Sequence, residues 1–303
     1  MTARRFLSRY AIYVALVVEC AVLALATNAF FTVGNLENVL RQNAFPAIIA
    51  AGMTFTILTA GIDLSVGSVV GLSGVVCADA IAHGWGLAPA IGAGIAVGVV
   101  VGVANGLIVT RVRIPPFIVT LAMMLVVRGM ALKYTNARTI SDLPPLLSPL
   151  SLGLPMTTAM VIVFALSWVA LERTAFGRHV YAIGGNADAA WLSGVRVNRV
   201  LMAVYIGCGA CAGLAGVLVA SRLNAGYPRA GELYELDAVA AVVVGGTSLF
   251  GGRGSIWGTL AGAFFIGILN NGLNLYNVSP YDQMIAKGVV LLAATSLDRW
   301  RIE

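Results

Sequence analysis

The residues of this sequence that could do chemistry are a few polar and charged side chains embedded in apolar segments. Asp63 and Ser65 belong to Gly61-Ile-Asp-Leu-Ser-Val-Gly-Ser68, which interrupts an apolar stretch from residue 44 to residue 82. Inside a membrane, a broken helix survives only where protein buries it or where it lines a cavity. The break therefore predicts a discontinuous helix beside a transport path, with Asp63 as the polar residue that faces this path. The alternative is that Asp63 or Ser65 only caps the next helix.

Two basic residues also lie within apolar segments and need partners. Arg128 lies in the middle of one, where a charge costs about 2.5–3.5 kcal/mol on insertion scales. It must therefore face the interior, and Asp63, Asp237 and Asp282 are its candidate partners. Arg128 either forms a structural ion pair, reaches the membrane interface or contacts a transported solute. Lys287 poses the same choice.

The one long polar stretch, residues 172–200, contains the signal of a short helix. The residues that form this signal are Asn186, Asp188, Trp191, Leu192 and Gly194. Asn186 is a good N-cap, the aspartate lies where the helix dipole favours negative charge, and Gly194 suits the C-terminal cap. The Trp191-Leu192 pair either docks into a groove of another protein or lies at the lipid headgroups.

The motifs of several other protein classes are incomplete. The segment Gly245–Ser255 is glycine-rich like a phosphate loop, but Gly252 stands where that loop needs a lysine. His83 and His179 fall on opposite sides of the expected bilayer, so they form no metal site. No zinc-protease or serine-hydrolase motif occurs. We therefore expect no catalysis, nucleotide binding or metal binding by this chain.

The elements that must position these residues are membrane-spanning helices. Of the 303 residues, 59% are hydrophobic and 11% are charged, whereas about a quarter are charged in soluble domains. The 35 glycines suit close helix packing in lipid. The basic residues are scattered over loop ends, so the net charge of +6 reflects membrane topology, with no nucleic-acid partner.

The sequence thus predicts an all-α integral membrane protein with about ten transmembrane helices in a single domain, residues 1–303. The expected spans are residues 11–31, 44–60, 66–82, 88–109, 116–133, 156–171, 201–221, 237–249, 255–275 and 282–297. The eighth is too short for a plain crossing helix, so we expect it to be broken or extended. Most of the 19 Lys/Arg fall on the side of the two termini, which predicts cytoplasmic termini and a cytoplasmic 172–200 loop.

A weak internal repeat relates the two halves. The fourth span ends with Ala104-Asn-Gly-Leu107 and the ninth with Asn270-Asn-Gly-Leu273, and each precedes a span with one embedded cation. Two halves of five spans insert in opposite senses because five is odd. The sequence therefore predicts an inverted repeat.

Glycines recur every four residues along the fourth span and again in the seventh. They are Gly94, Gly98, Gly102 and Gly106, and then Gly209 and Gly213. This spacing predicts close helix contact, either within the subunit or between two copies.

Several longer segments resemble a known family. They are Gly61–Ser68, Arg113–Leu121 with Arg128-Gly129, Tyr181–Asn186, Glu235–Leu249, Asn270–Leu275 and Gln283–Val290. Together they resemble the permease subunits of ATP-binding-cassette (ABC) importers for ribose, xylose, arabinose and galactose. The resemblance covers roughly residues 35–299 and is strongest for the ribose group.

The resemblance implies a permease, not itself an enzyme, that moves a neutral monosaccharide, ribose or a related pentose, across a bacterial inner membrane. It also implies a second permease copy as a homodimer, a cytoplasmic ATPase that binds ATP–Mg, and a periplasmic sugar-binding protein. This chain would hold no cofactor. The stretch from Asn186 to Gly194 would be the coupling helix seated on the ATPase. The alternative is an ion-coupled secondary sugar carrier.

The resemblance supplies no sugar contacts residue by residue. The cost of burying polar groups instead selects five candidates for the substrate pathway: Asp63, Ser65, Asn105, Arg128 and Asn271. A lining of Asn, Ser and Thr with few charges suits sugar hydroxyls better than ions.

Overall fold

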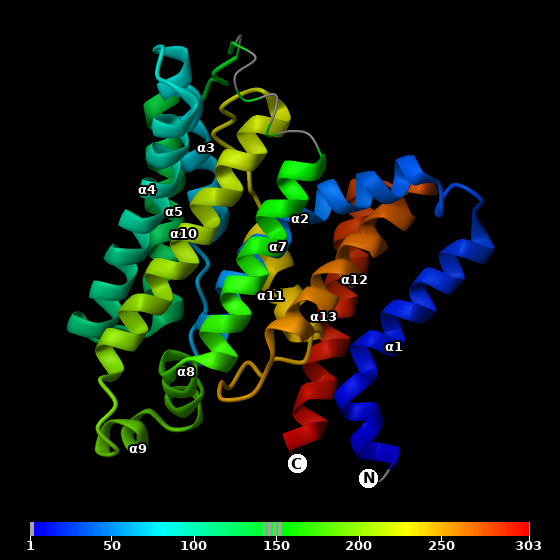
Figure 1. Ribbon diagram of the computed structural model, residues 1–303, viewed down its shortest axis with the longest axis vertical. Helices are drawn as coiled ribbons and strands as arrows, with labels where there is room; N and C mark the ends of the chain where they lie inside the picture. Colours follow the sequence, from blue (N-terminus) through cyan, green and yellow to red (C-terminus); the bar gives the residue numbers. More distant parts are fainter. Residues whose placement is uncertain (1–2, 142, 145–146, 148–149, 151–152, 303) are drawn as a thin grey trace.

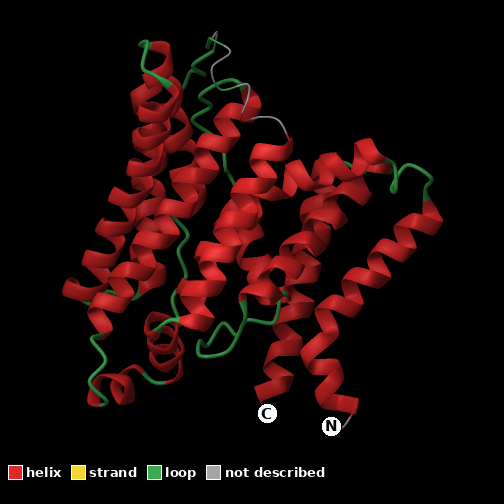
Figure 2. Cartoon of the chain, viewed as in Figure 1, coloured by secondary structure: helices red, strands yellow, loops and turns green. Residues whose placement is uncertain are grey.

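The computed structural model describes residues 3–141, 143–144, 147, 150 and 153–302, and this part is helical without β-strands (Figure 2). The helices are α1 (Ala3–Ala26), α2 (Val33–Leu58), α3 (Val66–Ala82), α4 (Leu87–Leu107), α5 (Pro116–Thr135), α7 (Gly153–Trp168), α8 (Ala175–Gly185), α9 (Ala187–Leu192), α10 (Val197–Leu223), α11 (Tyr234–Val244), α12 (Ile256–Leu275) and α13 (Pro280–Ile302). Two π-helical turns, η1 (Ile108–Val112) and η2 (Val169–Arg173), extend α4 and α7. The predicted all-α class is confirmed.

Five helical stretches in the described part are long and apolar enough to cross a membrane. They are Leu87–Val112, Pro116–Thr135, Leu154–Arg173, Val197–Leu223 and Ile256–Leu275. The other expected spans overlap α1, α2, α3, α11 and α13, which are shorter or more polar. The multi-pass membrane architecture is therefore supported, while the number of ten crossings stays a prediction.

Several expected span boundaries differ from the helices, and three of them show why. The first span was expected to reach residue 31, but α1 ends at Ala26. The second was expected from residue 44, but α2 begins at Val33 because Thr32 caps it by accepting a hydrogen bond from the backbone of Asn35. The eighth was expected to reach residue 249, but α11 ends at Val244, just before a glycine turn. The expected spans were placed by continuous apolar sequence. This approach leaves out the polar first turns of a helix and does not see the short glycine turns that end one.

The two halves of the chain are related as the inverted repeat predicts (Figure 1). The corresponding pairs are α1 and α7, α2 and α10, α3 and α11, α4 and α12, and α5 and α13, and the members of each pair run in opposite directions. Contacts between the halves follow the same relation, since α10 packs against α3 and α4 while α2 packs against α11 and α12.

The discontinuous helix expected near residues 61–68 is present with shifted bounds. α2 ends at Leu58, residues 59–65 form no helix, and α3 already begins at Val66. The last residues of the sequence motif are therefore helical, and the break itself lies just before them.

A second irregular stretch, residues 224–233, precedes α11 in the other half. The two breaks meet inside the bundle, where Gly67 and Gly231 touch so closely that a Cβ on either would contact the other's carbonyl oxygen. The N-terminal ends of α3 and α11 thus lie together in the interior. Only glycine permits this approach of two backbones.

The predicted glycine contact is confirmed within the subunit, between α4 and α10. Gly98 lies against the backbone of Gly209, and Gly102 lies against the backbone of Tyr205. The missing side chains let the two helix backbones touch, as small residues do in membrane bundles.

Replacing Gly98 by Leu is expected to destabilise the fold strongly. Even the added Cβ would overlap the carbonyl group of Gly209, which is backbone and cannot swing aside. Overpacking of this kind costs about 1–3 kcal/mol or more. The measurement is thermal melting of the purified protein, with Gly92→Leu as control because a Cβ there meets nothing within 4 Å. Equal melting temperatures for the two variants would contradict this packing.

Candidate functional site

The end of the bundle that carries both chain termini also carries α8 and α9 (Figure 1). α9 begins as expected, because the side-chain oxygen of Asn186 accepts a hydrogen bond from the backbone of Ala189 at 2.9 Å. Asp188 lies in its first turn. Trp191 is 66% exposed and Leu192 is 78% exposed. This short helix therefore presents two large apolar side chains at the end of the molecule.

The C-terminal cap of α9 lies one residue earlier than expected, at Ser193 instead of Gly194. Ser193 is the cap residue, and Gly194 follows it with φ +85. The backbone N–H of Val195 then donates to the carbonyl of Ala190 at 3.0 Å. This is the left-handed helix ending in which glycine is favoured, so Gly194 stops the helix just beyond its cap.

Sequence reasoning missed α8, the helix that carries α9. Thr174 caps it by accepting a hydrogen bond from the backbone of Gly177 at 3.3 Å. Its buried apolar residues, Val180 and Ile183, follow Phe176 at helical spacing. A Thr N-cap followed by this apolar periodicity was the signal that could have revealed it.

The α8–α9 unit is tied to the interior break. Gly184 packs directly against the backbone of Leu58, the last residue of α2, and Gly252 donates its N–H to the same Leu58 carbonyl at 2.9 Å. The Tyr181 hydroxyl donates to the carbonyl of Gly254 at 2.9 Å. Burial raises the pKa of Tyr181 above its ordinary value, so it stays a donor. The α8–α9 unit thus contacts the point where the first break begins.

Three of the five pathway candidates come together at that break. Asp63 accepts hydrogen bonds from the backbone and the hydroxyl of Ser65 at 2.9 and 2.6 Å. Asn105, on α4, donates to the Ser65 hydroxyl at 2.9 Å. All three are at most 1% exposed. The cluster closes a local turn and fastens the break to α4.

Arg128 meets backbone carbonyls, whereas an acidic partner was expected. Its guanidinium donates to the carbonyls of Pro228 and Ala230 at 2.7 and 3.0 Å, and to that of Gly67 at 3.1 Å. The side chain thereby binds the irregular stretch 224–233 and the first turn of α3 at once. In lipid, such freed carbonyls need a donor, and Arg128 supplies it.

The fifth candidate, Asn271, lies apart from the others. It exchanges two side-chain hydrogen bonds with Asn35 of α2, at 2.8 and 3.0 Å. This amide pair joins the start of α2 to the end of α12. Its role in a pathway stays a prediction, as do the roles of the other four candidates.

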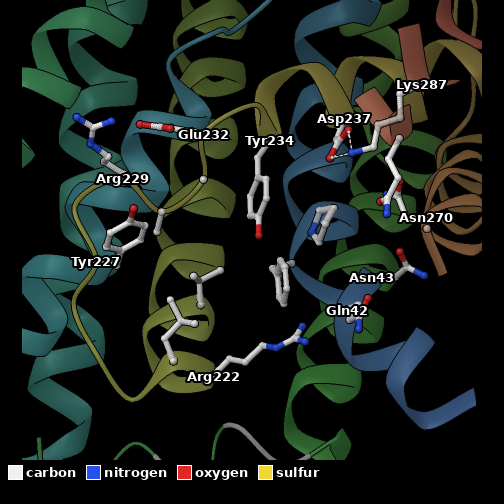
Figure 3. Close-up of a pocket in the computed structure, with 18 of the residues that line it drawn as sticks. Gln42, Asn43, Arg222, Tyr227, Arg229, Glu232, Tyr234, Asp237, Asn270 and Lys287 are labelled. Carbon is white, nitrogen blue, oxygen red and sulfur yellow. Dashed lines mark hydrogen bonds and ion pairs between the residues drawn. The ribbon is translucent and has the colours of Figure 1, made fainter. Parts of the chain in front are cut away.

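A polar cavity of about 650 Å³ lies elsewhere in the described part, and none of the five candidates lines it (Figure 3). Its walls come from the N-terminal half of α2, the end of α10, the second break, and the adjoining turns of α11, α12 and α13. Its polar residues are Gln42, Asn43, Arg222, Tyr227, Arg229, Glu232, Tyr234, Asp237, Asn270, Asn274, Gln283 and Lys287. In Figure 1 these turns lie in the half of the bundle away from α9.

The cavity wall contains stacked aromatic rings and an ion pair. The Phe45 and Tyr234 rings stack with centroids 5.8 Å apart, and Lys287 pairs with Asp237 at 2.9 Å. Pro46, which also lines the cavity, has no N–H to donate to the carbonyl of Gln42 one helical turn earlier. The lining thus combines amides and aromatic rings with five charged side chains, which are Arg222, Arg229, Glu232, Asp237 and Lys287.

The chain resembles sugar permeases over nearly its whole length. The family model described as branched-chain amino acid transport system / permease component matches residues 35–295. The ribose import permease of Bacillus subtilis is 48% identical, over 95% of this chain and 91% of that protein. That of Haemophilus influenzae is 44% identical, over 98% and 94%. The D-allose transport system permease of Escherichia coli is 37% identical, over 97% and 92%.

No solved structure matches the chain. The expected resemblance to sugar-importer permeases is confirmed by these relatives, and the alternative of an ion-coupled secondary carrier has no support among them.

Proposed function

Because the chain belongs to the family of permease components of branched-chain amino acid transport systems, we propose that it is the transmembrane permease subunit of an ATP-driven importer of ribose. The observation that carries this proposal is its near full-length identity to ribose permeases, which exceeds that to the allose permease. As a permease component it hydrolyses no ATP, and a separate ATPase with bound ATP–Mg supplies the energy.

We place the protein in a bacterial inner membrane with both termini in the cytoplasm. In this orientation α9 faces the cytoplasm and the polar cavity lies in the periplasmic half. A periplasmic sugar-binding protein delivers ribose to that half, and a second copy of the permease completes the transporter as a homodimer. The positive-inside distribution of Lys and Arg supports this orientation.

The coupling role falls to α9. Trp191 and Leu192 dock into an apolar groove of the ATPase, as short helices do in peptide grooves. When ATP binding moves the ATPase, α9 and α8 move with it and push on Leu58, where α2 ends against Gly184 and Gly252. The first break absorbs this movement, so the two halves of the bundle change their packing.

The four candidates Asp63, Ser65, Asn105 and Arg128 hold the backbone in place and do not contact the sugar. Asp63, Ser65 and Asn105 hold the first break to α4, and Arg128 holds the second break to α3. The two breaks meet at the centre of the bundle, so these contacts set the shape of the path. Direct sugar contact belongs to the polar cavity.

Uptake by proteoliposomes tests the proposed function. We expect the permease, its ATPase and a ribose-loaded binding protein to accumulate ribose only when ATP is inside the vesicles with the ATPase. A protonophore should leave this uptake unchanged. Ribose uptake that persists without ATP and stops with the protonophore would instead establish a secondary carrier.

A further inference from the structure

Another cavity, of about 220 Å³, lies between α7 and α10. Both helices pack against α2, which forms the floor of the cavity through Gly52 and Phe55. At Gly52 the backbones of α2 and α10 come so close that an added Cβ would lie 2.9 Å from the Cα of Cys208. The cavity is therefore the space that α7 and α10 leave above a helix they share.

The lining of this cavity is apolar. Its residues are glycines or carry hydrocarbon side chains, apart from the hydroxyl of Ser167 and the thiols of Cys208 and Cys211. An apolar cavity of about 150 Å³ stays dry and holds a benzene ring. The space between α7 and α10 thus has room for a stretch of hydrocarbon chain.

The cavity opens at the outer surface of the bundle. Leu166 on α7 is 65% exposed, and Ala203 and Gly207 on α10 are exposed as well. Both helices are long and apolar enough to cross a membrane, so this opening faces lipid. A helix of a second copy, about 10–12 Å wide, is too thick to enter a space of this volume. A single acyl chain is thin enough.

Two arginines flank the end of the cavity where α8 packs against η2 and α10 (Figure 1). Arg199 lies in the first turn of α10, four residues before Ala203, so both lie on one face of the helix. Arg178 of α8 donates to the carbonyl of Thr174 at 3.3 Å. The Thr174 hydroxyl in turn donates to the carbonyl of Ala170, a residue of the cavity wall.

These two cations are available to an anion. Arg178 and Arg199 are exposed, and neither forms an ion pair within the part of the chain that the structure describes. In the proposed orientation they lie at the cytoplasmic leaflet, which contains anionic lipids, and basic pockets between helices on this side bind anionic headgroups. The planar guanidinium also matches the geometry of a phosphate. A hydrocarbon cavity beside a pair of arginines fits the two parts of a phospholipid.

From this geometry we propose that the cavity between α7 and α10 binds one acyl chain of an anionic phospholipid, whose phosphate is held by Arg178 and Arg199. The proposal rests on the proposed function for the leaflet that supplies the lipid. Phe176 of α8 lines the cavity and packs on Phe55 with ring centroids 6.1 Å apart. The bound chain therefore supports the helix that carries α9.

Replacing Gly207 by Leu tests the cavity, because the new side chain occupies the space of the acyl chain. A Cβ at Gly207 meets nothing within 4 Å, so the fold accommodates it. We expect native mass spectrometry with added phosphatidylglycerol to show one tightly bound lipid on the parent permease and several-fold less on this variant. Phosphatidylglycerol should also raise the melting temperature of the parent but not that of Gly207→Leu.

Gly92→Leu is the matched control, since a Cβ there also meets nothing within 4 Å and Gly92 lies outside the cavity. It should retain the lipid and gain stability from it like the parent. Equal retention of phosphatidylglycerol by the parent, Gly207→Leu and Gly92→Leu would overturn the site.

Replacing Arg199 by Gln tests the headgroup contact. One cationic residue near an anionic membrane surface is worth about fivefold in affinity, so phosphatidylglycerol should bind about fivefold more weakly. Phosphatidylcholine with the same acyl chains should bind the parent weakly and Arg199→Gln no worse. The control is Arg111→Gln, which removes an exposed arginine from η1, away from the cavity. Equal binding of the two lipids by the parent would overturn the anionic headgroup.

The ATPase is the other partner that could meet Arg199, because α10 follows α9 directly. We expect Arg199→Gln and Gly207→Leu to co-purify with the ATPase as the parent does. An Arg199→Gln protein that keeps its phosphatidylglycerol but loses the ATPase would assign Arg199 to that interface and overturn the lipid site.

The outcomes separate the two proposals, because lipid binding is measured on the permease without ATP or ribose. If the unmodified transporter takes up no ribose with ATP while Gly207→Leu and Arg199→Gln lose the lipid, only the proposed function fails. If it takes up ribose and both variants retain phosphatidylglycerol like the parent, only the lipid site fails.

Discussion

Replacing Trp191 by Ala together with Leu192 by Asp should abolish ATP-driven uptake and leave the permease folded and inserted. Both side chains are mostly exposed, at 66% and 78%, so their loss costs the isolated fold little. Docking, however, would lose a buried tryptophan, which is worth about 2 kcal/mol or more at an interface centre, or about thirtyfold in affinity. It would also place a carboxylate in an apolar groove.

The measurement is ribose uptake by proteoliposomes together with co-purification of the ATPase. The control variant combines Val161→Ala and Leu166→Ala, two comparably exposed apolar residues on α7, and should transport and bind the ATPase normally. Normal uptake by the correctly inserted Trp191/Leu192 variant would remove α9 from the coupling path.

Replacing Arg128 by Met should lower the stability of the fold severely. The backbone carbonyls of Gly67, Pro228 and Ala230 would lose their hydrogen bonds from the guanidinium inside the bundle. Hydrogen bonds to charged groups are worth about 1.5–3 kcal/mol each, and no water replaces them in the membrane interior. We expect several kcal/mol of lost stability, with a lower melting temperature and a lower yield of inserted protein.

Lys133→Met is the matched control, because Lys133 is on the same helix but exposed. It should melt like the parent. A stable Arg128→Met protein with reduced ribose uptake would move Arg128 from a structural role to the path. Unchanged stability and uptake would rule out both roles.

The helices, the break and the α9 signal could be predicted because each depends on local sequence. Apolar runs give spans, Gly61 and Asp63 mark the break, and Asn186 caps α9 within three residues of itself. The inverted repeat was predictable from two embedded cations and one repeated tripeptide. These signals need no knowledge of which helices pack together.

The partners of the embedded charges could not be predicted, because they are distant in sequence. Arg128 binds carbonyls about 100 residues away, which have no sequence signature. Asp237, a candidate partner for Arg128, instead pairs with Lys287, 50 residues further on. A search for opposite charges finds candidates, but only the packing of α11 against α13 selects the pair.

The polar cavity was missed for a related reason. Ranking polar residues by the cost of burial selects those enclosed by protein, such as Asp63 and Asn105, which are at most 1% exposed. A pathway residue must instead face a space that only the assembled helices create. Asn43 and Asn270 come from opposite ends of the sequence, and no local spacing relates them.

The measurement that tests the account most directly is the ATPase activity of this permease, purified with its partner ATPase and reconstituted in lipid. The account predicts a stable complex whose ATP hydrolysis is stimulated by the ribose-loaded binding protein and much less by the empty one. Failure of every candidate sugar-importer ATPase to form a complex, with ribose uptake that continues without ATP, would contradict it.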